Sequence, residues 1–214
     1  MTEREKILSA IALLFHVAGA IGMATSAREW FIACTPYTLI LMTILVVFSL
    51  KPLDKNLKIF IIFSSLVGFL AEWIGVNTGL LFGEYDYGEH FGVKIGNVPL
   101  LIGALWFTTV YAGIQAVKWW EEKSGKKLNS LLVALFGSML ITCYDIILEP
   151  AAIKLGYWTW KGSTVPIFNY FSWFIVSFLI IFLSEKYFKA NKDALFPVIL
   201  SLIQVVFYLW HFFL

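Results

Sequence analysis

The sequence predicts an all-α integral membrane protein, a single polytopic domain over residues 1–214 with about seven transmembrane helices. Three observations indicate this class. Hydrophobic residues make up 60% of the chain and charged residues 14%, the mean hydropathy is +0.81, and apolar runs cover most of the length. Soluble domains are about half apolar and a quarter charged, so this composition indicates a chain surrounded by lipid.

Seven apolar runs predict the helices, because each is about seventeen residues or longer and can cross a hydrocarbon core. In chain order they cover residues 7–24, 34–50, 57–73, 98–117, 128–148, 167–184 and 194–213. We expect the fifth helix to end before Pro150, since proline breaks a helix interior. The first run, with its basic start, also resembles a secretory signal cleaved after Ala27, but it is longer than a typical signal core.

The basic residues predict an orientation with the N-terminus in the cytoplasm and the C-terminus outside. The inside segments then hold 12 of the 16 basic residues: Arg4, Lys6, Lys51, Lys55, Lys58, Lys118, Lys123, Lys126, Lys127, Lys186, Lys189 and Lys192. The outside segments keep Arg28, Lys94, Lys154 and Lys161. This is the asymmetry of the positive-inside rule, and the net charge of +2 gives no reason to expect nucleic acid as a partner.

Two outward segments match in order and spacing. Glu72 precedes Gly83, Tyr85 and Tyr87 by the intervals at which Asp145 precedes Gly156, Trp158 and Trp160. A Val-Pro pair follows each aromatic pair, at Val98-Pro99 and Val165-Pro166, with Trp106 and Trp173 seven residues after the prolines. We interpret helices three and four, and five and six, as a parallel internal repeat. A belt of interfacial aromatic residues is the alternative, although it does not explain the intervals.

Three carboxyl groups are the candidate catalytic residues. Glu72 and Asp145 occupy matched positions, and Glu149 shares a helical face with Asp145 at i+4. Acids within a membrane helix usually face the bundle interior and are functional, although these three could instead be solvated at the outer boundary. A buried carboxyl that keeps its proton, surrounded by aromatic faces, is suited to protonating an alkene and stabilising the resulting cation.

Metal and organic-cofactor chemistry receives no support from the sequence. His16, His90 and His211 are scattered, and there is no P-loop, dinucleotide fingerprint or GxSxG motif. Cys34 and Cys143 have no CxxC spacing and should pack as small hydrophobes. His16 lies in mid-membrane and needs a polar partner, either a ligand or a structural hydrogen bond.

At these residues the sequence resembles a known family. The blocks "FHVAG", "EWIGVNTGLLFGEYDYG", "VPLLIGALW", "DIILEP", "GYWTW" and "VPIFNYFSWF" are similar to those of carotenoid biosynthesis membrane proteins that include the carotenoid 1,2-hydratases of the gamma-carotene and bisanhydrobacterioruberin type. The resemblance covers roughly residues 15–182. One departure is Glu149, where the family commonly has aspartate before the proline.

The resemblance implies hydration of the terminal C1–C2 double bond of an acyclic psi end group, without a cofactor, on a lipophilic carotenoid in a bacterial or archaeal cytoplasmic membrane. In this scheme Asp145 is the general acid, Glu72 handles the water, and Glu149 tunes both, although the near-symmetry of Asp145 and Glu72 allows the reverse. The expected substrate-binding residues are Tyr85, Tyr87, Trp158, Trp160, Trp173 and His16, with Asn169 or Asn77 positioning water.

Two alternatives stay open from the sequence. A lycopene-type cyclase would form the same cation and let an internal double bond capture it in place of water. A membrane transporter would also contain intramembrane acids and a parallel repeat, but the acids here cluster at one end and no polar path continues across the bilayer. The polar residues Asn77, Thr78, Asn97 and Asn169 favour hydration.

Overall fold

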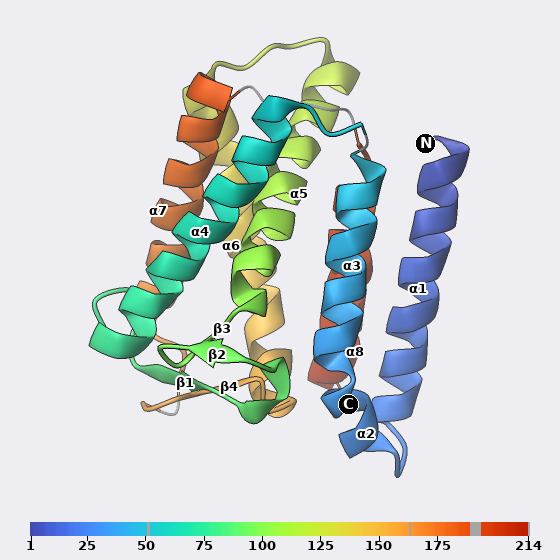
Figure 1. The fold of residues 1–214 in the computed structure, drawn as a ribbon, viewed down its shortest axis with the longest axis vertical. Helices are drawn as coiled ribbons and strands as arrows, with labels where there is room; N and C mark the ends of the chain where they lie inside the picture. Colours follow the sequence, from blue (N-terminus) through green and yellow to red (C-terminus); the bar gives the residue numbers. More distant parts are fainter. Residues whose placement is uncertain (51, 163, 189–193, 214) are drawn as a thin grey trace.

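The computed structural model describes residues 1–50, 52–162, 164–188 and 194–213, and Figure 1 shows that they form an up-and-down helical bundle. Its helices are α1 (Glu3–Met23), the short α2 (Arg28–Ala33), α3 (Thr35–Ser49), α4 (Lys55–Thr78), α5 (Leu101–Ser124), α6 (Ser130–Lys154), α7 (Ile167–Leu183) and α8 (Phe196–Phe213), and α7 continues into a π-helical turn, η2 (Ser184–Phe188). Each predicted apolar run lies on one of the longer helices.

The bundle has the composition of a multi-pass membrane protein. In the described part of the chain, five helices are long and apolar enough to cross a membrane: α1, α4, α6, α7 with most of η2, and α8. Leu14, Ile62 and Leu202 are each at least 60% exposed on its outer surface, whereas polar side chains such as Ser64 and Ser177 are buried inside. Apolar outside and polar inside is the distribution expected of helices in lipid.

Helices α3 and α5 differ from these five. Helix α3 is apolar but has 15 residues. Helix α5 is buried along much of its length and contacts α3, α4, α6 and α8. A helix surrounded by other helices needs no continuous apolar surface, which explains why α5 carries Gln115 and Tyr111 in its interior.

Most of the basic residues lie at one end of the bundle. The N-terminus and the α3–α4 and α5–α6 connections lie at one end, and the strands and the C-terminus lie at the other. The first end holds Arg4, Lys6, Lys55, Lys58, Lys118, Lys123, Lys126, Lys127 and Lys186. Lys51, Lys189 and Lys192, which the sequence places with them, lie outside the described residues.

Local signals account for the helix limits, with one exception. Asp54 and Asn129 cap the first turns of α4 and α6, accepting from the backbone N–H of Leu57 at 2.8 Å and of Leu132 at 2.9 Å. The predicted break before Pro150 is wrong, because α6 continues to Lys154. Proline removes its own N–H bond and its ring crowds the preceding turn, but membrane helices tolerate this because neighbouring groups and small local adjustments satisfy the freed carbonyl.

Short strands close the end of the bundle opposite the N-terminus. Strand β1 (Tyr85–Tyr87) pairs antiparallel with β4 (Trp158–Trp160), so that Asp86 lies opposite Thr159. Strand β2 (Lys94–Ile95) pairs with β3 (Val98–Pro99), and a 3-10 turn, η1 (Glu89–Phe91), precedes them. The β1–β4 ribbon therefore joins the two segments whose spacing matches in the sequence.

Candidate functional site

The three candidate acids lie together inside the bundle, above the β1–β4 ribbon. Glu72 comes from α4, and Asp145 and Glu149 come from successive turns of α6. Their exposed fractions are 3%, 1% and 2%, respectively, so none of them is a solvated boundary carboxylate. Pro150 does not interrupt α6, and Asp145 and Glu149 therefore keep the common face that their i+4 spacing predicts.

Glu72 is surrounded by hydrogen-bond donors. The hydroxyls of Tyr85 and Tyr87 both donate to its Oε2, the second at 2.8 Å, and the indole of Trp106 donates to Oε1 at 3.0 Å. Tyr85 and Tyr87 are alternate residues of a strand, so their rings leave it on the same side. Gly83 makes this approach possible with a φ of 118°, in the region that favours glycine.

Both tyrosines act as donors because they stay protonated. Burial raises the pKa of each hydroxyl well above its ordinary value, and the neighbouring Glu72 carboxylate raises it further. Three donors and no acceptor around one carboxyl group are the partners that an ionised carboxylate requires. Glu72 is thus surrounded by groups suited to a negative charge.

The Asp145 side of the site has different partners. The indoles of Trp158 and Trp160 donate to Glu149 Oε2 at 2.9 and 3.1 Å. The amide nitrogen of Asn169, on α7, lies between the two acids, 2.9 Å from Asp145 Oδ2 and 3.3 Å from Glu149 Oε1. Asp145 Oδ1 is buried and has no hydrogen-bond partner among the described residues. This oxygen is free to carry a proton.

The spacing in the sequence matches Glu72 with Asp145, but the hydrogen bonds match Glu72 with Glu149. A tyrosine hydroxyl lies at the far end of its ring, whereas the indole N–H lies closer to the backbone. Trp158 and Trp160 therefore meet the carboxyl group that is one turn nearer to their strand, which is Glu149. Asp145, one turn farther away, is left for Asn169.

Glu72, Asp145 and Glu149 line one small chamber. Its volume is about 20 Å³, and its lining includes the three acids, Tyr85, Tyr87, Trp158, Trp160, Asn169 and Trp173. One water molecule needs roughly 10–15 Å³ of such space, so the chamber has the size of one water. The polar groups of its lining, which include the three acids and Asn169, offer the hydrogen bonds that a bound water would require.

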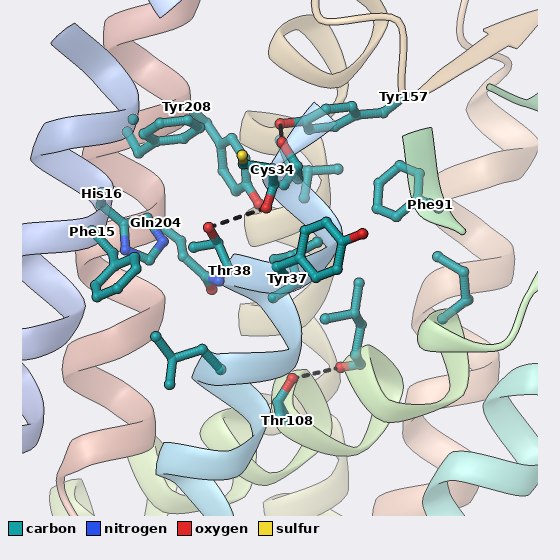
Figure 2. Close-up of a pocket in the computed structure, with 18 of the residues that line it drawn as sticks. Phe15, His16, Cys34, Tyr37, Thr38, Phe91, Thr108, Tyr157, Gln204 and Tyr208 are labelled. Atoms are coloured by element: carbon teal, nitrogen blue, oxygen red, sulfur yellow. Dashed lines mark hydrogen bonds between the residues drawn. The ribbon is translucent and has the colours of Figure 1, made fainter. Parts of the chain in front are cut away.

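A large cavity of about 520 Å³ adjoins the chamber. Glu72, Tyr87, Trp158 and Trp173 line both spaces, so Glu72 is within reach of a ligand in the large cavity, whereas Asp145 and Glu149 line only the small chamber. Figure 2 shows His16, Gln204 and Tyr208 at one end of this cavity and Phe91 and Tyr157 at the other. Its walls are mostly aromatic and aliphatic, which suits an apolar ligand.

Of the other predicted site residues, Trp173 belongs to the site and Asn77 does not. Trp173 lines both spaces and stacks on Trp106, with ring centroids 4.2 Å apart and an interplanar angle of 12°. Asn77 is not part of the site, because it is exposed and its amide nitrogen donates to the carbonyls of Trp73 and Gly96. Asn77 lies in the last turn of α4, just before the C-cap residue Gly79, and from there its side chain holds the outer loop in place.

Several residues that line the site escaped the sequence argument, among them Trp106, Tyr144 and Gln204. Trp106 could have been found as the match of Trp173 in the spacing, whereas no sequence signal identifies Tyr144 or Gln204, which also line the large cavity. Within the described ranges, no group of three or more His, Cys, Asp and Glu side chains is arranged to hold a metal ion.

Comparisons with known proteins identify the family of this chain. Residues 34–214 match the family model described as "Carotenoid biosynthesis protein". The chain belongs to the carotenoid biosynthesis protein family. It is also 27% identical, over 178 residues, to a bisanhydrobacterioruberin hydratase of Haloarcula japonica; the aligned region covers 77% of this chain and 60% of that relative. The chain thus spans about 60% of the length of this curated relative. No solved structure matches the chain.

Proposed function

We propose that the protein is a carotenoid 1,2-hydratase, which adds water across the terminal C1–C2 double bond of an acyclic psi end group. The observation that carries this proposal is the water-sized chamber lined by Glu72 and Asp145, which shares lining residues with a large apolar cavity. The name of the Haloarcula relative and the carotenoid biosynthesis family support the same reaction class.

The first step is proton transfer from Asp145. Its Oδ1 accepts no hydrogen bond in the described structure, so it can hold a proton and deliver it to C2 through one water in the chamber that Asp145 lines. The electron pair of the double bond forms the new C2–H bond and leaves a tertiary cation at C1. The aromatic faces of Trp158 and Trp173 and the Glu72 carboxylate stabilise this positive charge.

The second step is capture of the cation by water. The water oxygen bonds to C1 while Glu72 accepts the proton that the water loses, and the product is a tertiary alcohol. Transfer of that proton to Asp145 restores the starting state, so the net reaction consumes one water and involves no oxidation or reduction. Glu149 and Asn169 hold Asp145 in place and adjust its proton affinity.

A cyclase remains the second candidate because it forms the same cation. Ring closure requires that water be excluded while an internal double bond reaches C1. The chamber favours hydration instead, since it offers polar contacts and room for one water next to the acids.

Pigment analysis of a carotenoid-producing host that expresses this chain tests the assignment. A hydratase adds the mass of one water to an acyclic carotenoid without new unsaturation. An unchanged mass with a shifted absorption spectrum would identify a cyclase, and unchanged pigments would contradict both candidates. Cells carrying the Asp145→Asn protein at equal expression are the matched control.

We also propose seven membrane crossings in a bacterial or archaeal cytoplasmic membrane, with the N-terminus inside. Helices α4–α5 and α6–α7 are then two copies related by a twofold axis along the membrane normal. In support, Gly88 N–H donates to Tyr157 C=O at 2.8 Å, and the matched Lys161 N–H donates to Glu84 C=O at 3.0 Å. The stacked pair Trp106 and Trp173 also consists of matched residues.

Reporter fusions check this topology. A reporter fused after Lys123 should read cytoplasmic, and a reporter inserted between Glu84 and Lys94 should read external. The reason is that seven crossings place the basic end of the bundle inside and the β1–β4 ribbon outside. An external signal at Lys123 would contradict the predicted orientation.

A further inference from the structure

The end of the large cavity between α1 and α8 contains a hydrogen-bond acceptor that has no partner among the described residues. His16 is 8% exposed, and its Nδ1 lies 2.7 Å from the carbonyl oxygen of Ala12. Because a carbonyl only accepts, Nδ1 carries the hydrogen, and Nε2 of the neutral ring is an acceptor. In the described residues no group donates to this Nε2, and His16 lines the cavity.

A donor without a partner belongs to the same end of the cavity. Gln204, on α8, accepts from the hydroxyl of Tyr144 through Oε1 at 2.9 Å. Its amide nitrogen is therefore turned away from Tyr144, and among the described residues nothing accepts from it. Gln204 and His16 both line this cavity, and Phe207, one turn along α8 from Gln204, packs edge-on against His16 with ring centroids 5.6 Å apart.

We infer that His16 and Gln204 form a hydroxyl-binding subsite at the end of the cavity between α1 and α8. A hydroxyl group donates to His16 Nε2 and accepts from the Gln204 amide, so one oxygen satisfies both side chains. A carboxylate does not fit, since it has no hydrogen for His16. An apolar group would leave both polar side chains unpaired, which is costly in an apolar cavity.

Two sources can supply this hydroxyl. One is the end group of a carotenoid alcohol, which makes the pair a determinant of substrate choice. The other is a water molecule held beside the polyene as a supply for the hydration step. Both readings place the hydroxyl in the cavity that the proposed function assigns to the carotenoid, and they therefore rest on that proposal.

Binding measurements separate the two sources without requiring turnover. The Asp145→Asn protein in lipid nanodiscs is titrated with lycopene and with 1-hydroxy-1,2-dihydrolycopene, following quenching of tryptophan fluorescence. If the ligand is a carotenoid alcohol, the hydroxylated compound binds roughly tenfold tighter, the effect of about one hydrogen bond. His16→Leu and Gln204→Leu abolish this preference, and His16→Gln, which keeps an acceptor, restores part of it.

Ser201→Leu is the matched control. It also replaces a half-buried polar residue of α8, but Ser201 bonds to the carbonyl of Pro197 and does not line the cavity. It should leave the affinity ratio unchanged. Gln204→Leu is best combined with Tyr144→Phe, because the Tyr144 hydroxyl would otherwise lose its acceptor.

Turnover by the parent protein decides the water alternative. If water is the ligand, both carotenoids bind equally, and His16→Leu and Gln204→Leu slow hydration of lycopene by roughly tenfold while its affinity stays the same. The subsite is overturned if both carotenoids bind equally well and the His16→Leu and Gln204→Leu variants hydrate lycopene at the parental rate. It is also overturned if both carotenoids bind equally well and the parent protein does not hydrate lycopene. A tenfold affinity difference that needs His16 and Gln204 supports it even if hydration is never observed.

Discussion

The two sides of the acid site have the same spacing in the sequence and different hydrogen bonding in space. On one side, two tyrosines and Trp106 donate to Glu72, which satisfies both of its oxygens. On the other side, two tryptophans donate to Glu149, and Asp145 keeps one oxygen without a partner in the described structure. Because tryptophans replace the tyrosines on the second side, the donated hydrogen bonds there go to Glu149 and not to Asp145, the residue that matches Glu72 in the spacing.

This difference shows how a repeated segment can acquire two chemical roles. A carboxyl group with three donors is suited to remain an anion, and a carboxyl group with an unpaired oxygen is suited to hold a proton. A reaction that begins with proton donation and ends with proton acceptance needs one of each. The near-symmetry that left the two roles interchangeable in the sequence is broken by the partners.

The largest expected effect comes from neutralising the two matched acids. Asp145→Asn removes the transferable proton and Glu72→Gln removes the acceptor, so each should lower the hydration rate by roughly 10²-fold to 10⁴-fold. The double variant should be little worse than either single variant, because both acids serve one reaction. Product formation from an acyclic carotenoid in nanodiscs measures these rates.

Glu84→Gln is the control for this prediction. Glu84 is an exposed carboxylate 3.4 Å from Lys161 on the outer ribbon, and it lines neither cavity. Neutralising this exposed carboxylate should change the hydration rate less than twofold, because the mechanism depends on the buried carboxyl groups. Folded Asp145→Asn and Glu72→Gln proteins with near-normal rates would contradict the mechanism and leave the family assignment intact.

A smaller difference should separate the phenol donors from the indole donors. Tyr87→Phe removes one bond to Glu72 and should slow hydration by about 10-fold or more, since bonds to charged groups are worth roughly 1.5–3 kcal/mol. Trp158→Phe removes a bond to Glu149, which takes no proton in the reaction, and should slow hydration by less than about 10-fold. Equal decreases in the hydration rate of Tyr87→Phe and Trp158→Phe would contradict the distinction between the Glu72 side and the Asp145 side.

The smallest predicted effects concern stability and separate the stacked tryptophans. Trp106→Phe leaves Glu72 Oε1 without its donor and should lower the free energy of unfolding by about 1–3 kcal/mol. Trp173→Phe changes mainly the stacking contact, worth about 0.5–1.5 kcal/mol. Both variants change the same stack, so thermal unfolding in detergent measures the hydrogen bond as the additional loss in Trp106→Phe. Equal losses in the two variants would show that this hydrogen bond contributes little to stability.

Much of the site could be predicted because its signals are local. Each signal lies within a single helix or strand: an acid in an apolar run, two aromatic residues two positions apart, and a second acid four residues after the first. The geometry of one helix or strand is enough to place such side chains on a common face. Glu72, Asp145, Glu149 and Asn169 accordingly meet where they were expected. Asn77 was misplaced because its partners, such as the Gly96 carbonyl, come from a loop whose path no periodicity describes.

By itself, the sequence determined the helical class, the position of each apolar run and the identity of the buried acids, since these follow from hydropathy and from spacing along one chain. Only the tertiary structure decided which acid receives which donor. That choice depends on how far a phenol and an indole extend from paired strands, and on which turn of α6 lies within reach. The grouping of His16 with Gln204 likewise required α1 and α8 to pack together, because nothing in either helix alone identifies the other as its partner.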